Sequence, residues 1–362
     1  MASFSAQQQL RTPTPYGTTA APPPTPSQNH HHHHHSTSAS AEDLSRLLHR
    51  LPAPSLSLPT RFSLPLFSLS SQNPQPPSQL GYFQLTDHSI PSQLSNSAQS
   101  ESLSLFSLSK DQKIQFFPQN WPLGYDGDDE LSHDLDESFC IDSESETELP
   151  LSSLKEFTRA LEKVGLQVID LLSRSVGFDN PLRDDPTQYC SLMWVSSSEG
   201  LVGNNKPVFS GKMYPYIVGL QYQLRSQKYS LLSDSGWVTV SPRVDSVLVT
   251  IGDIAQVWSN GKLKKVRGRP VPNLGDDNIS NKAHTITMTL LVSLPMESTI
   301  APLVPAMLED EAEDEADHGD EDKVHKRDQE RAVFRSFSFE DYAWRVYHER
   351  LLLKDPLDRY RV

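Results

Sequence analysis

Residues 209–271 have the pattern of successive β-strands joined by tight turns. Short runs rich in β-branched residues, such as 238–240 and 246–251, are separated by turn signals. These signals are Asp-Ser-Gly at 234–236, Gly-Asp at 252–253 and Asn-Gly at 260–261. Strands this short bury their apolar residues only by pairing into sheets that pack on other elements. The stretch therefore predicts the core of a β-barrel or β-sandwich.

The same stretch carries motif residues in a fixed order. They are Gly236-Trp237, Pro242, Gly252-Asp253, Gln256, Ser259-Asn260-Gly261, Lys264, Val266, Arg269 and Val271. A second set lies at Gly81, Phe83, Gln84, His88, Ile90 and Pro91. Together they resemble the plant 2-oxoglutarate and Fe(II)-dependent dioxygenases, the superfamily typified by isopenicillin N synthase, with its gibberellin and flavonoid oxidases. The resemblance implies a mainly β fold with flanking helices, in which an N-terminal α/β subdomain precedes a double-stranded β-helix (jelly-roll) core.

The resemblance also implies an iron site, and the chain departs from it. The family holds Fe(II) with two histidines and one carboxylate, and holds 2-oxoglutarate with an arginine and a serine. The matching positions of this chain carry Met213, Pro215, Gly268, Thr285 and Thr287. None is a histidine, a carboxylate or an arginine, so we expect neither Fe(II) nor 2-oxoglutarate as a cofactor. The side chains expected to line the remaining pocket are Trp194, Lys212, Tyr214, Arg267 and Arg269.

Two functions follow from this comparison. The first is a non-catalytic relative that keeps the fold and binds a small molecule or a protein, because fold alone does not determine activity. The alternative is an active 2-oxoglutarate-dependent oxidoreductase of plant hormone or secondary metabolism, with unusual metal ligands. His284 is the histidine available on the strands of this half, although an exposed strand end explains it equally well.

Charge and cysteine content bound the partners and the compartment. The 362 residues carry a formal net charge of -14, which argues against nucleic-acid binding. Two cysteines, Cys140 and Cys190, suggest a reducing compartment rather than a disulfide framework. We expect a cytoplasmic or nuclear monomer with no membrane partner, while a chloroplast transit peptide stays open because residues 1–41 lack acids and contain Arg11.

Composition divides the chain into five segments. They are a disordered tail (1–41), an N-terminal subdomain (42–150), a long helix with the β core (151–300), an acidic disordered insertion (301–332) and a C-terminal helix (333–362). Six consecutive histidines at 30–35 indicate a purification tag or low-complexity sequence rather than a rigid metal site. The acidic run 309–322 lacks the spacing of a calcium loop.

Local patterns predict two helices and a loop. Residues 93–106 look helical, and apolar residues at helical spacing follow a capping box at Ser153 and Glu156 until Gly177. Residues 126–148 are polar and acidic, which predicts a loop that contains Cys140. In this loop Asp128 and Asp129 are expected to be solvated rather than to act as an acid–base pair. Residues 285–290 alternate threonine with apolar residues, as a strand with one buried face does.

Three further sets of side chains invite a functional interpretation. We expect His88 to satisfy hydrogen bonds within a turn rather than to bind a ligand. An aromatic and apolar stripe is expected to pack against the core, and it consists of Tyr342, Val346, Tyr347 and Leu351. A basic cluster could hold an anionic ligand or the acidic insertion, and it consists of Lys262, Lys264, Lys265, Arg267 and Arg269.

Overall fold

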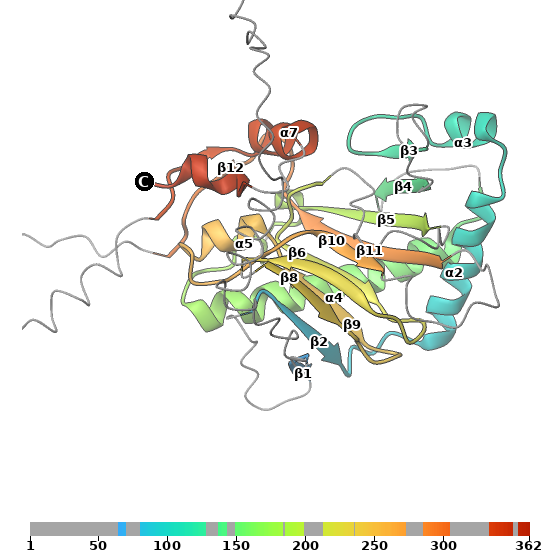
Figure 1. Ribbon diagram of the computed structural model, residues 1–362, viewed down its shortest axis with the longest axis horizontal. Coiled ribbons are helices and arrows are strands. Elements are labelled where there is room, and N and C mark those ends of the chain that lie inside the picture. The colour runs from blue at the N-terminus through green and yellow to red at the C-terminus, as the bar shows by residue number, and fades with distance from the viewer. Residues whose placement is uncertain are drawn as a thin grey trace, which may run out of the picture. The chain divides into compact units, whose positions relative to one another are not determined.

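Two β-sheets form the centre of the computed structural model (Figure 1). The structure describes residues 64–69, 80–127, 137–142, 149–183, 185–198, 213–234, 236–272, 285–304, 333–349 and 354–362, all within one compact unit, Pro59–Val362. The predictions for the tail, the histidine run, the acidic run 309–322, Asp128, Asp129, Lys212 and His284 fall outside the described residues.

The larger sheet has eight strands. Their order is β1 (Leu66–Ser68), β2 (Tyr82–Thr86), β9 (Val247–Ile251), β6 (Val218–Tyr222), β11 (Thr285–Ser293), β5 (Cys190–Ser198), β4 (Glu137–Asp142) and β3 (Gly124–Asp126). All neighbours pair antiparallel except β1 and β2. A three-stranded sheet has the order β10 (Val266–Pro272), β7 (Tyr229–Ser233) and β8 (Gly236–Val240). The strands β12 (Thr299–Ile300) and β13 (Phe337–Ser338) pair separately.

Two long helices cover one face of the larger sheet, α2 (Ser92–Phe106) and α4 (Ser152–Val176). A side chain added at Gly165 of α4 would meet Val292 and Leu220 at 2.9 and 3.0 Å, so the glycine lets the helix lie close to β11 and β6. The remaining helical segments are α3 (Lys110–Phe116), α5 (Asp253–Trp258), α7 (Phe339–Glu349), η1 (Pro186–Gln188) and η2 (Pro356–Tyr360). Both predicted helices are confirmed.

The start of α4 differs from the predicted capping box. The side chain of Glu101, on α2, accepts hydrogen bonds from the backbone N–H groups of Ser153 and Leu154 at 3.0 and 2.8 Å. The N-cap residue is Leu151, and no side-chain cap is formed there. A carboxylate from a neighbouring helix therefore satisfies the free N–H groups that a local box would have satisfied. The predicted end is confirmed, because Gly177 caps the helix with φ +90°.

Two further local predictions were wrong. Cys140 does not lie in a loop, because residues 137–142 form β4 and pair with β5. The face expected to be exposed on β11 is also buried, since Thr289 is 3% exposed. Helices cover one side of β11, where Ser102 of α2 lies 3.4 Å from Met288, while the three-stranded sheet lies toward the other side. A strand that is covered on both faces buries its polar residues as well as its apolar ones. The alternation of threonine with apolar residues therefore does not indicate an exposed face on β11.

His88 has the structural role that the sequence predicts. Its Nδ1 accepts the N–H of Ile90 at 3.1 Å, so the proton lies on Nε2, which is 3.1 Å from the carbonyl oxygen of Asp245. The ring thereby joins the β2–α2 turn to the loop before β9. Among the described residues, no helix is both long enough and apolar enough to cross a membrane.

Candidate functional site

The space between the two sheets is lined on the larger sheet by alternate residues. Thr287 and Thr289 of β11 lie directly opposite Ser196 and Trp194 of β5, so these four side chains share one face. Since Met288 points to α2, this face turns toward the three-stranded sheet. Thr287, expected at the position of the cosubstrate arginine pair, therefore lies on the inner face, and the side chain of Thr285 is not among those described.

Strand β10 is irregular where the resemblance places the second histidine. Arg267 pairs with Leu232 and Val271 pairs with Ser230, so β10 advances four residues while β7 advances two. Gly268 opens this bulge with φ +68°, a backbone conformation that glycine adopts without strain. A histidine at this position would take the same left-handed backbone at a cost, so the local geometry favours glycine.

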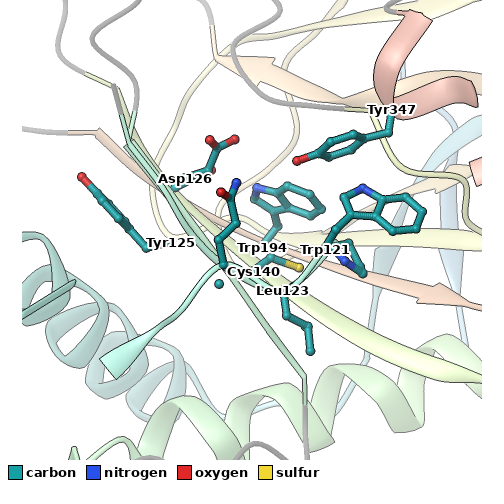
Figure 2. Close-up of a pocket in the computed structure, with 11 residues that line it drawn as sticks. Trp121, Leu123, Tyr125, Asp126, Cys140, Trp194 and Tyr347 are labelled. Carbon is teal, nitrogen blue, oxygen red and sulfur yellow. The ribbon is translucent and has the colours of Figure 1, made fainter. Parts of the chain in front are cut away.

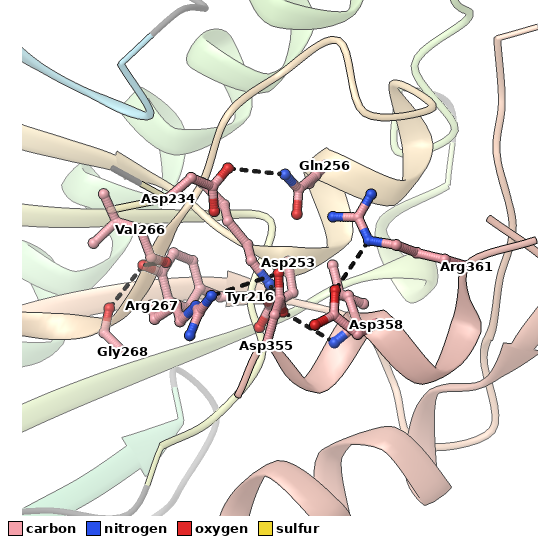
Figure 3. Close-up of polar contacts among 12 residues, drawn as sticks. Tyr216, Asp234, Asp253, Gln256, Val266, Arg267, Gly268, Asp355, Asp358 and Arg361 are labelled. Atoms are coloured by element: carbon pink, nitrogen blue, oxygen red, sulfur yellow. Dashed lines mark hydrogen bonds and ion pairs between the residues drawn. The ribbon is translucent and has the colours of Figure 1, made fainter. Parts of the chain in front are cut away.

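Tyr216 holds the bulge in place (Figure 3). Its hydroxyl lies 2.8 Å from the carbonyl oxygen of Gly268, 3.2 Å from that of Val266 and 3.2 Å from Oγ1 of Thr250. Tyr216 is 1% exposed, and burial raises the pKa of its phenol, so the phenol stays protonated at neutral pH. The sequence analysis did not single out this residue, although its spacing of two from Tyr214 places both side chains on one face of an extended segment.

Met213 and Pro215 stand at the positions of the first histidine and the carboxylate, and they lie in different surroundings. Met213 is buried, and the carbonyl of Pro215 accepts the hydroxyl of Ser293 at 2.8 Å. Tyr214 lies between them and packs against Trp121 and Phe339 at ring-centroid distances of 5.9 and 6.0 Å. The segment before β6 thus presents two buried tyrosines near Gly268 and the C-terminal helix.

Arg269 crosses from β10 to the larger sheet. Its guanidinium lies 4.1 Å from the ring centroid of Trp194, and Nη1 donates to Oγ of Ser196 at 3.1 Å. A cation over an indole face is attracted by the negative face of the ring. Two predicted pocket residues, Arg269 and Trp194, are therefore brought together between the sheets.

The other basic residues of this strand have a different position. Lys265 is completely buried, and its Nζ lies 2.5 Å from Oδ1 of Asp253 and 2.7 Å from Oδ1 of Asp355. Arg267 lies 3.7 Å from the second oxygen of Asp355, so it faces the C-terminal segment (Figure 3). Lys265, which the sequence placed in the basic cluster, and Arg267, which was expected to line the pocket, thus lie beside two carboxylates of the protein itself, from α5 and the start of η2.

A small pocket opens at the end of the jelly roll next to Trp194 (Figure 2). Its walls are contributed by the 119–126 segment, by β4 and β5, and by Tyr347 of α7. Trp121 packs edge-on against Tyr347 at 5.4 Å and against Trp344 at 5.7 Å. The sequence predicts that Tyr347 packs against the core. Tyr347 packs against Trp121, and its side chain also lines the pocket.

Burial keeps the two thiols and the Tyr214 phenol around this pocket protonated. Burial raises the pKa of the Cys140 thiol and of the Tyr214 phenol. Burial, together with the Asp142 carboxylate, raises the pKa of Cys190 to about 12. Thiols with a raised pKa are poor nucleophiles at neutral pH. The chemistry that this pocket supports is therefore packing and hydrogen bonding rather than nucleophilic attack.

The donor set does not fit an iron centre. Among the described residues, no group of three His, Cys, Asp or Glu side chains is close enough together to hold a metal ion. The carbonyl of Gly268 accepts the hydroxyl of Tyr216, and the next residue in the chain is Arg269. Arginine stays protonated in proteins and has no lone pair to offer a metal. The described side chains around Gly268 therefore do not fit Fe(II).

The sequence profile of the 2OG-Fe(II) oxygenase superfamily matches residues 214–282. The chain contains a domain of this superfamily. It is 24% identical over 305 residues to 1-aminocyclopropane-1-carboxylate oxidase 2 of Doritaenopsis sp., covering 76% of this chain and 84% of the relative. It is 25% identical over 250 residues to gibberellin 2-beta-dioxygenase 1 of Pisum sativum, covering 63% and 74%.

Solved structures of the 2OG-Fe(II) oxygenase superfamily confirm the predicted jelly-roll fold of this chain. The crystal structure of JOX2 in complex with 2OG, Fe and JA has a TM-score of 0.62 at 14% identity, and covers 83% of this chain and 89% of that one. The dioxygenase for auxin oxidation of rice has a TM-score of 0.58 at 17% identity, and covers 83% and 100%. The chain thus shares the fold of these oxygenases.

Proposed function

We propose that this chain is a non-catalytic member of the 2OG-Fe(II) oxygenase superfamily whose jelly roll serves as a binding module. The observation that carries the proposal is Gly268, which stands at the position of a metal-ligating histidine and opens the β10 bulge with φ +68°. Glycine has no side chain that could bind a metal, and among the described residues no three His, Cys, Asp or Glu side chains lie close enough together to hold one. Tyr216, bonded to the carbonyl of Gly268, adds a phenol of raised pKa, which is a poor metal ligand.

The jelly roll is stable without a bound metal because other interactions hold it together. Buried apolar residues, the Lys265 ion cluster and the two covering helices hold the jelly roll without any contribution from a metal. Members of a fold class commonly keep the scaffold while the site changes. Binding a small molecule or a protein requires only the pocket and its rim, and both are present beside Trp194.

An anaerobic titration of the full chain with Fe(II) and 2-oxoglutarate tests the proposal. The histidine run at 30–35 is deleted first, because it can bind metal by itself. We expect no visible charge-transfer absorption band of an iron–oxoacid complex and no release of succinate under air. The pea gibberellin 2-beta-dioxygenase, titrated in parallel, shows that the assay detects an intact site. A band or succinate release in the deletion variant would overturn the proposal.

A further inference from the structure

The chain segment between β12 and β13 begins and ends beside one turn. Before the segment, the backbone N–H of Val304 donates to the carbonyl oxygen of Trp258 at 3.3 Å. After it, the N–H of Val333 donates to Oδ1 of Asn260 at 2.7 Å. Residues 305–332, which lie outside the described residues, are therefore attached at both ends to the turn that follows α5.

This segment carries a dense run of negative charge. Ten of the fourteen residues at 309–322 are Asp or Glu, and none is Lys or Arg. Glu309 follows Val304 by five residues, a length of chain that spans at most about 18 Å. The chain length therefore keeps the start of this acidic run within reach of the surface around the turn.

The surface beside this turn is basic, although the chain as a whole is acidic. Gly261 lies next to Phe334, and the guanidinium of Arg361 lies 5.0 Å from the ring centroid of Phe334. Nη2 of Arg335 donates to the carbonyl oxygen of Arg359 at 2.9 Å. Three segments thus bring together the exposed cations of what we call the basic face: Lys262, Arg335, Arg359 and Arg361.

Few carboxylates of the described residues compensate the basic face. Arg361 pairs with Asp358 at 3.1 Å, and both side chains are exposed, so water and salt weaken this pair. Asp355, the other acid of the C-terminal segment, belongs to the buried ion cluster instead. Among the described residues, neither Lys262 nor Arg359 has an acidic partner. Both cations are therefore available to carboxylates of another segment.

We propose that the basic face is a docking surface for the acidic run of the same chain, residues 309–322. A single exposed ion pair is weak, but several carboxylates face several cations here and act together. Attachment at both ends makes the binding intramolecular, with an effective concentration of about millimolar. Of the five cations that the sequence groups as a basic cluster, Lys262 alone belongs to this face.

The docked run would control which partners reach the basic face. An acidic protein that binds there must displace the run, so the segment acts as an internal competitor for such partners. The inference goes beyond the proposed function and does not depend on it, because no residue of the basic face lines the pocket beside Trp194.

A labelled peptide with the sequence of residues 309–322 tests the proposal by fluorescence anisotropy, at about pH 8, where the histidine run is neutral. It is titrated into the full chain and into a neutralised variant, a full-length chain whose ten acids in this run are Gln or Asn. We expect saturable binding to the neutralised variant at about 0.05 M salt and its loss at about 0.5 M. The wild type should bind the peptide at least about tenfold more weakly, because its own run occupies the face. Equal affinity for both chains, or no binding to the neutralised variant, would overturn the proposal.

Two matched double variants of the neutralised chain locate the surface. Lys262→Gln with Arg359→Gln removes two charges of the basic face and should weaken peptide binding about fivefold or more. Lys110→Gln with Lys163→Gln removes two exposed charges on α3 and α4, and should change the affinity by less than about twofold. Equal weakening by the two double variants would mean a general attraction by net charge, against the proposal.

A carbodiimide cross-link tests the contact in the wild-type chain. This reagent joins a lysine amine to a carboxylate in direct contact with it, without a spacer. Digestion and mass spectrometry should find Lys262 joined to residues 309–322 at least about tenfold more often than the exposed Lys163 of α4. Comparable yields for the two lysines would show that the run does not rest on the basic face.

Discussion

Two cations four residues apart, Lys265 just before strand β10 and Arg269 within it, have contrasting environments. Lys265 is 0% exposed and is held by the carboxylates of Asp253 and Asp355. Arg269 is half-buried, with an indole face on one side and a serine hydroxyl at one nitrogen. The first cation joins β10 to α5 and to the C-terminal segment, whereas the second extends between the sheets to β5. One strand thus carries a structural charge and a charge at the pocket.

This contrast shows how a scaffold and its site can change separately. Asp253 follows Gly252 in the matched motif, and Lys265 lies in the same matched stretch. Their ion pair is buried, and neither residue lines the pocket beside Trp194. The bulge at Gly268 separates the two environments, because the extra residues reset which side chains point between the sheets.

The largest expected effect comes from removing the structural charge. Lys265→Met leaves two buried carboxylates without their common partner, and we expect it to lower the free energy of unfolding by about 3–5 kcal/mol. Urea denaturation followed by tryptophan fluorescence measures this loss. Lys264→Met, at the exposed neighbouring position, is the control and should change stability by less than about 0.5 kcal/mol. Similar losses in both variants would remove the contrast between the two cations.

A smaller effect is expected at the pocket cation. Arg269→Met removes the cation over Trp194 but keeps most of the side-chain volume, so the loss of unfolding free energy should be about 1–2 kcal/mol. The same denaturation experiment measures it. Because Trp194 loses a cation from its ring face, its fluorescence should change in the folded protein. A loss as large as that of Lys265→Met would mean that Arg269 is also a structural charge.

The smallest expected effect is a pH dependence confined to the structural cluster. Burial raises the pKa of Asp355, but Lys265, the N–H of Leu357 and Arg267 outweigh this and hold it below its ordinary value of 3.8. The carboxylate therefore stabilises the fold above the unfolded-state pKa, and this stabilisation is lost as pH falls through the folded-state pKa.

The measurement compares denaturation midpoints from about pH 5 down to about pH 3. The wild type and Arg269→Met should lose stability in parallel over this range. Asp355→Asn should begin less stable and lose less on acidification, because the titrating group is gone. An unchanged pH dependence in Asp355→Asn would show that other carboxylates account for the acid sensitivity.

Much of the fold followed from residue patterns. The hairpin turn at 234–236, the helix 93–106 and the end of the long helix at Gly177 all depend on local backbone preferences, which act over a few residues. The Asn-Gly signal at 260–261 does not join two strands, because it follows the helix α5 (Asp253–Trp258). The predicted capping box failed because Glu101, about fifty positions earlier in the chain, reaches the same N–H groups. Strand β4 was missed because its polar residues are buried only by pairing with β5.

The candidate site was predicted less completely than the fold. The motif comparison identified Trp194, Tyr214, Arg269 and Gly268, which the structure places around the space between the sheets. It gave Arg267 the same role, although Arg267 lies beside Asp355, and it overlooked Tyr216 and Trp121. Trp121 reaches the pocket from a loop that follows α3, and Tyr347 reaches it from the C-terminal helix. No local sequence pattern indicates that Trp121 and Tyr347 line the same pocket, because these contacts join segments far apart in the sequence.

The amino-acid sequence by itself determined several strands of the β core, the two long helices and the absence of histidine and aspartate at the matched motif positions, because these depend on residue identity and short spacing. The tertiary structure alone decided which groups each cation meets. The bulge after Arg267, where Gly268 has φ +68°, interrupts the regular alternation of the strand. Arg269, within the bulge, lies over Trp194, while Lys265, before β10, lies between its two carboxylates.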